Sequence, residues 1–90
     1  MQAGGGHKMS FFYTYVLKSK KDNHLYIGWP DNLVARYKKH MDGNVVATKY
    51  RRPLILVYYE ACLDKKAAIK REKQLKTGFG RLYLKNRIDS

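Results

Sequence analysis

The sequence predicts an α+β domain in which a small three-stranded, mainly antiparallel sheet is flanked by helices. Two neighbouring tyrosine-rich segments predict a hairpin, and a later apolar segment predicts one more strand. Two helical segments, each with a capping residue at its start, separate and follow these strands. The expected order is therefore β-β-α-β-α, followed by a short final helix for which the pattern is weaker.

Aromatic and β-branched residues mark the strands. Residues 11–17 and residues 24–29 both carry this pattern, and the turn formers Asp22 and Asn23 lie between them. We expect these segments to pair as an antiparallel hairpin, which sets their tyrosines side by side. The third strand is expected over residues 54–59 or slightly beyond, directly after Pro53.

The first helix is expected over about residues 32–41. Asp31 or Asn32 can cap its start, and Gly43 lies where a left-handed residue often ends a helix. Its apolar positions have the three-to-four-residue spacing of a face turned toward a sheet, and they are Leu33, Val34, Tyr37 and Met41.

The second helix is expected from near Asp64, a suitable N-cap, to near Gly78. The stretch GFGRLYLKNRI that follows indicates a short final helix, although its two glycines weaken the pattern. In that helix, Leu82, Tyr83 and Leu84 are expected to turn inward.

Length and cysteine content limit the class of protein. The 90 residues suffice for one domain, expected over residues 9–90, with any active site in a surface groove. Residues 1–8 are interpreted as a disordered or added leader, with Met9 as a natural start. Cys62 is the single cysteine, which excludes a disulfide within the chain and fits a reducing, cytoplasmic location. No apolar segment approaches the roughly 20 residues of a membrane span.

The chain is strongly basic. Its 19 Lys and Arg against 7 Asp and Glu give a formal net charge of +12. This balance favours a polyanion as partner, because each phosphate neutralised by Lys or Arg releases condensed counterions. A ribosomal protein, or one that is merely basic, is the alternative that charge alone leaves open.

An acidic residue interrupts the expected inward face of the second helix. At about 100° per residue, Ala68, Glu72 and Leu75 fall on one stripe, with Ile69 at its edge. An inward carboxylate is costly unless it is paired or binds a metal. Glu72 is therefore a candidate functional carboxylate. A salt bridge to one of the many cations, or a stripe edge that reaches water, is the alternative.

Arg36 and His40 are spaced i, i+4 on the first helix and so share one side of it. His40 lies about 20° from Leu33 around the helix, and Arg36 lies about 40° further toward solvent. Both side chains should therefore border the groove beside the helix–sheet contact. An arginine offers a planar fork to a phosphate, and a histidine can transfer a proton near neutral pH. The alternative is that both are ordinary exposed surface residues without a role in a site.

The stretch KYRRP surrounds Tyr50 with three cations, Lys49, Arg51 and Arg52. Basic residues around an aromatic ring suit a nucleic-acid backbone with a base or sugar stacked on the ring. A solvated loop whose tyrosine packs back on the domain is the alternative.

Taken in order, these features resemble the GIY-YIG nuclease superfamily: a tyrosine triplet in a strand, a nearby YIG, a helix with Arg and His, and a helix with an inward Glu. The likeness extends from about residue 11 to residue 88 and is closest to the small, stand-alone, single-domain members. The YIG triplet is Tyr26, Ile27 and Gly28, and the GIY triplet falls on Tyr13–Thr14–Tyr15. The segment REKQLK, with Glu72, is similar to the one that holds the glutamate of this family.

The resemblance carries over five candidate catalytic residues and shows two departures. The first triplet lacks both the glycine and the isoleucine, and Trp29 and Pro30 follow YIG, where they could reshape the groove entrance. The late asparagine of the family has only Asn86 as a weak candidate. The residues that match are Tyr15, Tyr26, Arg36, His40 and Glu72.

The resemblance implies phosphodiester hydrolysis assisted by one divalent ion, Mg2+ or Mn2+, held by Glu72. Arg36 would neutralise charge that builds on the phosphate, and His40 would relay a proton. Either Tyr15 or Tyr26 would orient or deprotonate the attacking water. A base role needs nearby positive charge, because an unperturbed phenol has a pKa of about 10.

The expected function is a metal-dependent endonuclease acting on DNA rather than RNA, in repair, recombination or mobile-element processes. The alternatives are a non-catalytic or weakly catalytic nucleic-acid-binding module and a ribosome-associated protein. Gly28 is expected to let a phosphate approach the backbone at the end of the second strand. The nuclease interpretation also requires both catalytic tyrosines to share one face with Arg36, His40 and Glu72.

Overall fold

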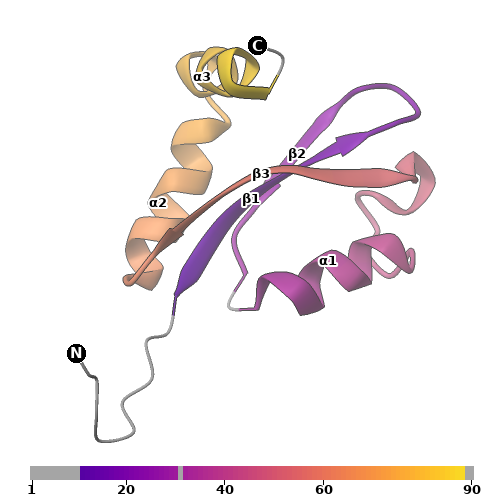
Figure 1. Cartoon of the computed structure of the whole chain (residues 1–90), viewed down its shortest axis with the longest axis horizontal. Helices are drawn as coiled ribbons and strands as arrows, with labels where there is room; N and C mark the ends of the chain where they lie inside the picture. Colours follow the sequence, from indigo (N-terminus) through magenta and orange to yellow (C-terminus); the bar gives the residue numbers. More distant parts are fainter. Residues whose placement is uncertain (1–10, 31, 89–90) are drawn as a thin grey trace, which may run out of the picture.

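A computed structural model describes residues 11–30 and 32–88 of the chain (Figure 1). The expected order is confirmed, including the final helix. The predicted leader at residues 1–8, the start at Met9 and the capping candidate Asp31 lie outside the described residues. The elements are β1 (Phe12–Ser19), β2 (Leu25–Gly28), α1 (Leu33–Met41), the 3-10 turn η1 (Lys49–Arg51), β3 (Leu54–Cys62), α2 (Lys65–Leu75) and α3 (Gly78–Ile88).

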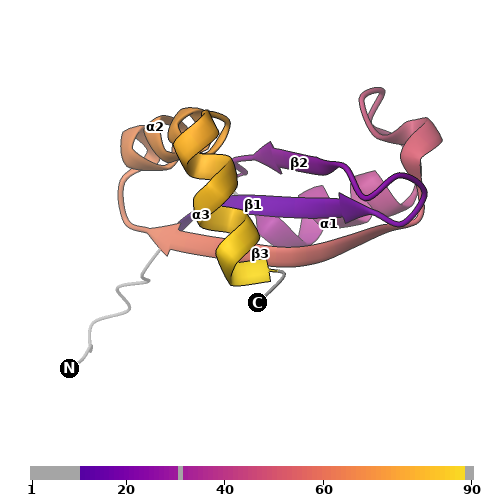
Figure 2. The ribbon, with the colours of Figure 1, turned by 90° about the horizontal axis from the view of Figure 1, so that it is seen from above.

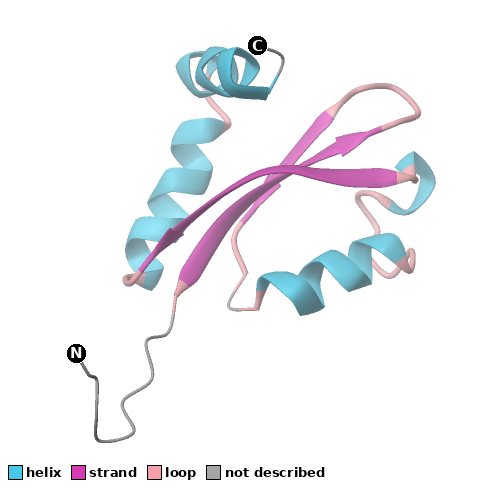
Figure 3. Cartoon of the chain, in the orientation of Figure 1, coloured by secondary structure: helices cyan, strands magenta, loops and turns pink. Residues whose placement is uncertain are grey.

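The three strands, drawn in magenta in Figure 3, form one antiparallel sheet in the order β2-β1-β3. Strand β1 is central because its residues pair on both sides: Tyr15 lies opposite Gly28 of β2 and opposite Tyr59 of β3. Residues 11–17 were expected as the first strand, and β1 continues to Ser19. The register shifts between Val16 and Leu17, so that Val57 is an extra residue on the β3 side.

The helices cover both faces of the sheet. In Figure 2, α3 crosses in front of the sheet and α1 lies behind it. Tyr15 and Leu17 face α1 and pack with Leu54 in one buried cluster, which Leu33 and Tyr37 of α1 cover. Val16 points the other way, because side chains alternate along a strand, and it packs with leucines of α2 and α3, Leu75 and Leu84.

Helix α1 begins and ends as the sequence indicates, but its inward face is narrower. The Asn32 side chain accepts a hydrogen bond from the Ala35 amide at 3.0 Å, and Gly43 has a positive φ of 80° just after the helix. The expectation that Val34 and Met41 turn inward is wrong, since they are 79% and 38% exposed. The contact with the sheet follows Leu33, Tyr37 and His40, and Val34 lies about 100° round the helix from Leu33.

The two C-terminal helices differ from expectation at their junction. Asp64 caps α2 as expected, accepting from the Lys66 amide at 3.1 Å, but α2 ends at Leu75 rather than near Gly78. The final helix is not short, since it spans 11 residues. Gly80 permits the tight turn between the helices, because a methyl group there would overlap the Gln74 carbonyl and Leu75. Of the inward set expected in α3, Leu84 is buried and Leu82 is exposed.

None of the helices in the described residues has the length and apolar character needed to span a membrane.

Candidate active site

A cavity of about 460 Å³ lies at the β2 edge of the sheet, where both faces meet. Its wall combines residues of β1, β2, α1, α2 and α3 with residues of the segment between α1 and η1. All five candidate catalytic residues line it, together with Gly28, Trp29, Thr48, Lys76 and Arg81, among others.

The Tyr15 hydroxyl is the centre of a hydrogen-bonded group. The Tyr15 side chain is only 4% exposed, and its hydroxyl lies 2.9 Å from Nε2 of His40. Arg36 Nε donates to the same oxygen at 3.4 Å. The i, i+4 spacing on α1 therefore brings both groups to one phenol, where the arginine contributes a positive charge beside the oxygen.

His40 is buried and held by a residue that the sequence analysis did not identify. Its Nδ1 lies 2.7 Å from Oγ1 of the buried Thr48. Burial, followed by the charge of Arg36, lowers the pKa of His40 below the ordinary 6.5. This shift favours the neutral form of the imidazole. No sequence motif marked Thr48, which meets His40 through the fold of the segment after α1.

Gly28 lies against the Tyr15 ring. A Cβ at Gly28 would lie 2.5 Å from the Tyr15 hydroxyl oxygen and 2.6 Å from Cζ. The expectation that this glycine leaves room for a phosphate is therefore corrected, because the phenol already occupies that space. The glycine instead allows Tyr15 to lie across the neighbouring strand and reach His40 and Arg36.

Tyr26 lies on the same face of the sheet as Tyr15. It is opposite Leu17 in the register, packs against the cluster that includes Tyr15, and is half-buried. Its ring meets that of His24 edge to face, with centroids 5.0 Å apart. Both tyrosines of the two motifs thus line the cavity, with Tyr15 deep and Tyr26 nearer solvent.

Glu72 comes from the opposite side of the sheet. It projects from α2, whose buried face packs on the Val16 side, and its side chain is 18% exposed. The expectation of one shared face does not hold for the sheet: Tyr15, Arg36 and His40 lie on the α1 side, and Glu72 comes from the α2 side. The five candidate residues nevertheless line one common cavity at the β2 edge, which is the proximity that the nuclease interpretation depends on. Its carboxylate pairs with Lys76 at 3.1 Å, so the salt bridge considered from the sequence is present.

The donor set limits what metal the cavity can hold. Across the described parts of the chain, no group of three or more His, Cys, Asp or Glu side chains could hold a metal ion. Mg2+ does not require such a group, because it keeps several waters and often takes one or two carboxylates plus substrate phosphates. Glu72, a hard oxygen donor in an open cavity, fits that mode of binding.

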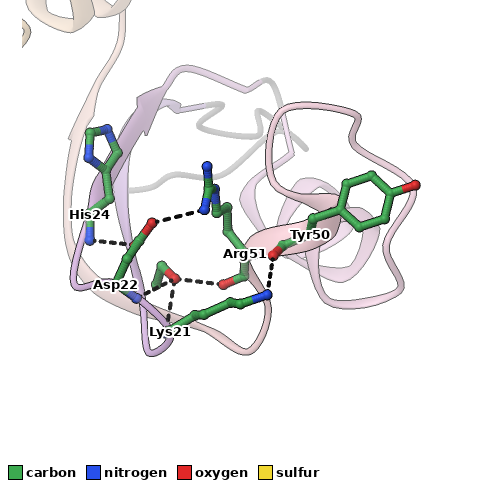
Figure 4. Close-up of polar contacts among 6 residues, drawn as sticks. Lys21, Asp22, His24, Tyr50 and Arg51 are labelled. Carbon is green, nitrogen blue, oxygen red and sulfur yellow. Dashed lines mark hydrogen bonds and ion pairs between the residues drawn. The ribbon is translucent and has the colours of Figure 1, made fainter.

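The four residues of the predicted basic loop do not line the cavity. Figure 4 shows Arg51 turned toward Asp22, an ion pair of 3.4 Å, and Lys21 donating to the Tyr50 carbonyl. The Arg52 side chain donates to the carbonyls of Met41 and Lys49, and Lys49 lies over the Tyr50 ring. These contacts link η1 to the β1–β2 turn, and Tyr50 as a residue is 74% exposed.

Comparisons with known proteins identify a family, relatives and a solved structure that are similar to this chain. Residues 11–87 match the family model described as GIY-YIG catalytic domain. The chain is 43% identical over 70 residues to UPF0213 protein SH2523 of Staphylococcus haemolyticus, covering 77% of this chain and 84% of that protein. It is 43% identical over 65 residues to UPF0213 protein CPE1444 of Clostridium perfringens, covering 71% and 69%. The solution structure of UPF0213 protein BH0048 from Bacillus halodurans is similar, with a TM-score of 0.52 and 30% identity over 82% of this chain and 81% of that one.

Proposed function

Because the chain belongs to the GIY-YIG catalytic-domain family, we propose that it is a divalent-metal-dependent endonuclease that hydrolyses phosphodiester bonds in DNA. The domain is in general a nuclease domain, so a nucleic acid is the expected substrate. One observation carries the proposal: a buried phenol, hydrogen-bonded to a histidine and an arginine, shares a cavity with a carboxylate. Repair, recombination or mobile-element processes in the cytoplasm are the proposed setting.

Four of the five candidate catalytic residues have a defined role in the proposed reaction. Arg36 places its charge beside the phosphate and offsets the negative charge that builds as water attacks phosphorus. The Tyr15 hydroxyl orients the water and takes its proton while passing its own to Nε2 of His40, which is free to accept when Nδ1 donates to Thr48. The bond from phosphorus to the 3′-oxygen breaks and this oxygen takes a proton from solvent, which leaves a 5′-phosphate and a 3′-hydroxyl. Glu72 would hold Mg2+ or Mn2+, which supplies Lewis-acid stabilisation of phosphoryl and leaving oxygens.

Further nucleic-acid contacts are proposed outside the cavity. Tyr50, with Lys49 above its ring, offers a stacking surface, and Arg51 and Arg52 beside it add positive charge. Asp22 offsets part of the Arg51 charge, so these contacts contribute mainly to affinity. Gly28 contributes through the position of Tyr15.

Cleavage assays test the proposal. Supercoiled plasmid, branched DNA and sequence-matched RNA are incubated with Mg2+, Mn2+ or excess chelator. We expect cleavage of DNA that requires the ion and falls by about 10²-fold or more in Arg36→Ala and Glu72→Ala. Thermal unfolding verifies that the variants are folded. Failure of the folded wild-type protein to cut any of these substrates would contradict the proposal.

A binding module without efficient chemistry is the second candidate, and the ion pair between Glu72 and Lys76 favours it. In that case the carboxylate is structural and already neutralised. Salt-dependent binding of DNA or RNA that is unchanged by Mg2+ and by Glu72→Ala would support this candidate over the nuclease.

A further inference from the structure

A second cavity, of about 300 Å³, adjoins the candidate active site. We name it the Trp29 cavity, and its lining is Trp29, Pro30, Asn32, Ala35, Arg36 and Lys39. Trp29 and Arg36 line both cavities, so these two side chains lie at the junction between them.

Trp29 presents a large flat ring at this junction. It follows directly on Gly28, whose neighbour across the sheet is Tyr15, and it is half-buried between the two cavities. The ammonium of Lys65 lies 5.2 Å from the centroid of the indole ring. Such a cation–π contact helps to fix the ring, and indole is the aromatic side chain that offers most area for stacking.

The polar groups of the Trp29 cavity suit the other parts of a nucleotide. Arg36 and Lys39 supply positive charge for phosphate, and none of the described residues that line this cavity is acidic. The Asn32 side-chain oxygen accepts from the Ala35 amide, which fixes the orientation of this side chain and leaves its NH2 group as a donor for a base edge. An aromatic ring, two cations and an amide donor are therefore gathered in one small cavity.

We propose that the Trp29 cavity is a nucleotide subsite, in which the base next to the scissile phosphate stacks on Trp29 and the neighbouring phosphate contacts Arg36 and Lys39. The position relative to the scissile phosphate rests on the proposed function, whereas the binding of a nucleobase does not. The guanidinium of Arg36, close to the Tyr15 hydroxyl, places this subsite one step along the strand from the reacting centre.

Trp29 is the only tryptophan of the chain, so its fluorescence reports on the subsite directly. The experiment titrates Glu72→Gln protein, in which cleavage is disabled, with a single-stranded DNA hexanucleotide and with six versions that each carry one abasic residue. We expect the intact hexanucleotide to produce a saturable change in tryptophan emission. One of the six abasic strands should still bind through its backbone but produce no such change. Binding of the hexanucleotide should weaken by about tenfold in Trp29→Leu, a typical loss for one stacked base.

Matched variants distinguish stacking on Trp29 from a general effect of removing an aromatic ring. Trp29→Phe should retain most of the affinity, and Phe79→Leu, which alters an aromatic residue 90% exposed on α3 and outside both cavities, should bind like the parent. Equal emission changes with every abasic strand, or equal affinities of Trp29→Leu and Phe79→Leu, would overturn the subsite.

The two proposals fail separately. If wild-type protein cuts no nucleic acid but its emission depends on one base, the nuclease proposal falls and the subsite stands. If DNA is cut in a Glu72-dependent way and no abasic position alters the emission, the subsite falls and the nuclease proposal stands.

Discussion

Tyr15 has defined contacts at both its ring and its hydroxyl. Its ring is packed in the cluster beneath α1, Gly28 leaves space for it on the neighbouring strand, and His40 and Arg36 both contact its hydroxyl. The resemblance to the GIY-YIG family predicted from the sequence that these residues belong to one site. The hydrogen bonds, and the reason for the glycine, depend on strand register and required the structure.

Substitution of Gly28 tests this arrangement. In Gly28→Ala, the new methyl group would overlap the Tyr15 phenol and displace it by a large fraction of an ångström or more. We expect single-turnover cleavage to fall by about 10²-fold, because misplacement by about 1 Å can cost that much. The free energy of unfolding should fall by about 1–3 kcal/mol. Gly78→Ala is the control, since no heavy atom lies within 4 Å of its added Cβ; equal behaviour of the two variants would contradict the steric explanation.

His40 should make the stability of the fold sensitive to acid. Its folded pKa is below 6.5, first because it is buried and then because Arg36 is close, so the unfolded chain takes up a proton more readily. The His40 contribution is therefore complete above the unfolded pKa and is lost as the pH falls through the folded pKa. The loss is up to about 1.4 kcal/mol for each pH unit between the two values.

Urea unfolding of wild type and His40→Gln at several pH values measures this effect. We expect the difference between the two proteins to change below pH 6.5 and to stay constant above it. A wild-type stability that rose on acidification through this range, relative to His40→Gln, would contradict a neutral buried imidazole. Cleavage should decline over the same range, because a protonated His40 cannot accept the proton of Tyr15.

At the level of elements, the segment between α1 and β3 is a structural part of the site. The Ser19 hydroxyl, buried at the end of β1, donates to the Arg51 carbonyl at 2.7 Å, and Arg52 reaches back to the Met41 carbonyl. These bonds anchor the segment at both sides, and Thr48 within it meets His40. The KYRRP stretch, predicted as a nucleic-acid contact, thus also positions a residue of the candidate site.

Thr48 variants test this role of the segment. Thr48→Val removes the hydroxyl at nearly constant shape and leaves Nδ1 of His40 without its partner in a buried position. We expect cleavage to fall by about tenfold and the acid limb of its pH profile to shift, and stability to fall by about 1–3 kcal/mol. Thr48→Ser retains the hydroxyl and should restore the wild-type pH profile. A pH profile unchanged in Thr48→Val would contradict a positioning role.

The sequence predicted the elements better than it predicted which side chains they bury. Alternation and capping residues located the strands and the start of both longer helices, because these signals are local. Val34 was wrongly predicted to be buried. The inward stripe of α1 is completed by His40, a polar residue that a search for apolar positions does not select. The extent of α3 was underestimated, because Gly80, which weakens a helix locally, is required by the contact with α2.

On the scale of the whole molecule, the candidate site lies where two separately packed faces meet. Tyr15, Arg36 and His40 belong to the α1 side, and Glu72 belongs to the α2 side, so the β2 edge is the place where both sets are accessible together. The helical stripe correctly indicated that Glu72 turns away from bulk solvent. The stripe could not indicate on which side of the sheet Glu72 lies, because the order of the strands and the path of the chain between them determine that side.

The overall charge of the chain affects how strongly a metal ion can bind. A net charge of +12 disfavours binding of a divalent cation, and Glu72 is the one acidic residue that lines the described cavity. Lys76, one turn along α2, already pairs with its carboxylate. We therefore expect the free protein to bind Mg2+ weakly and the ion to bind mainly together with DNA, whose phosphates supply negative charge and oxygen ligands.

Removal of the Lys76 charge should then favour the metal. In Lys76→Gln, the Glu72 carboxylate loses its competing cation, and the Mg2+ concentration for half-maximal cleavage at saturating DNA should fall by about two- to fivefold, since such i, i+4 pairs are weak. The KM for DNA should rise, because one cation that lines the cavity is removed. Lys73→Gln removes an equal charge from the exposed side of the same helix and should leave the Mg2+ requirement unchanged. A requirement that is unchanged or increased in Lys76→Gln would show that Lys76 does not compete with the ion, and would count against Glu72 as its ligand.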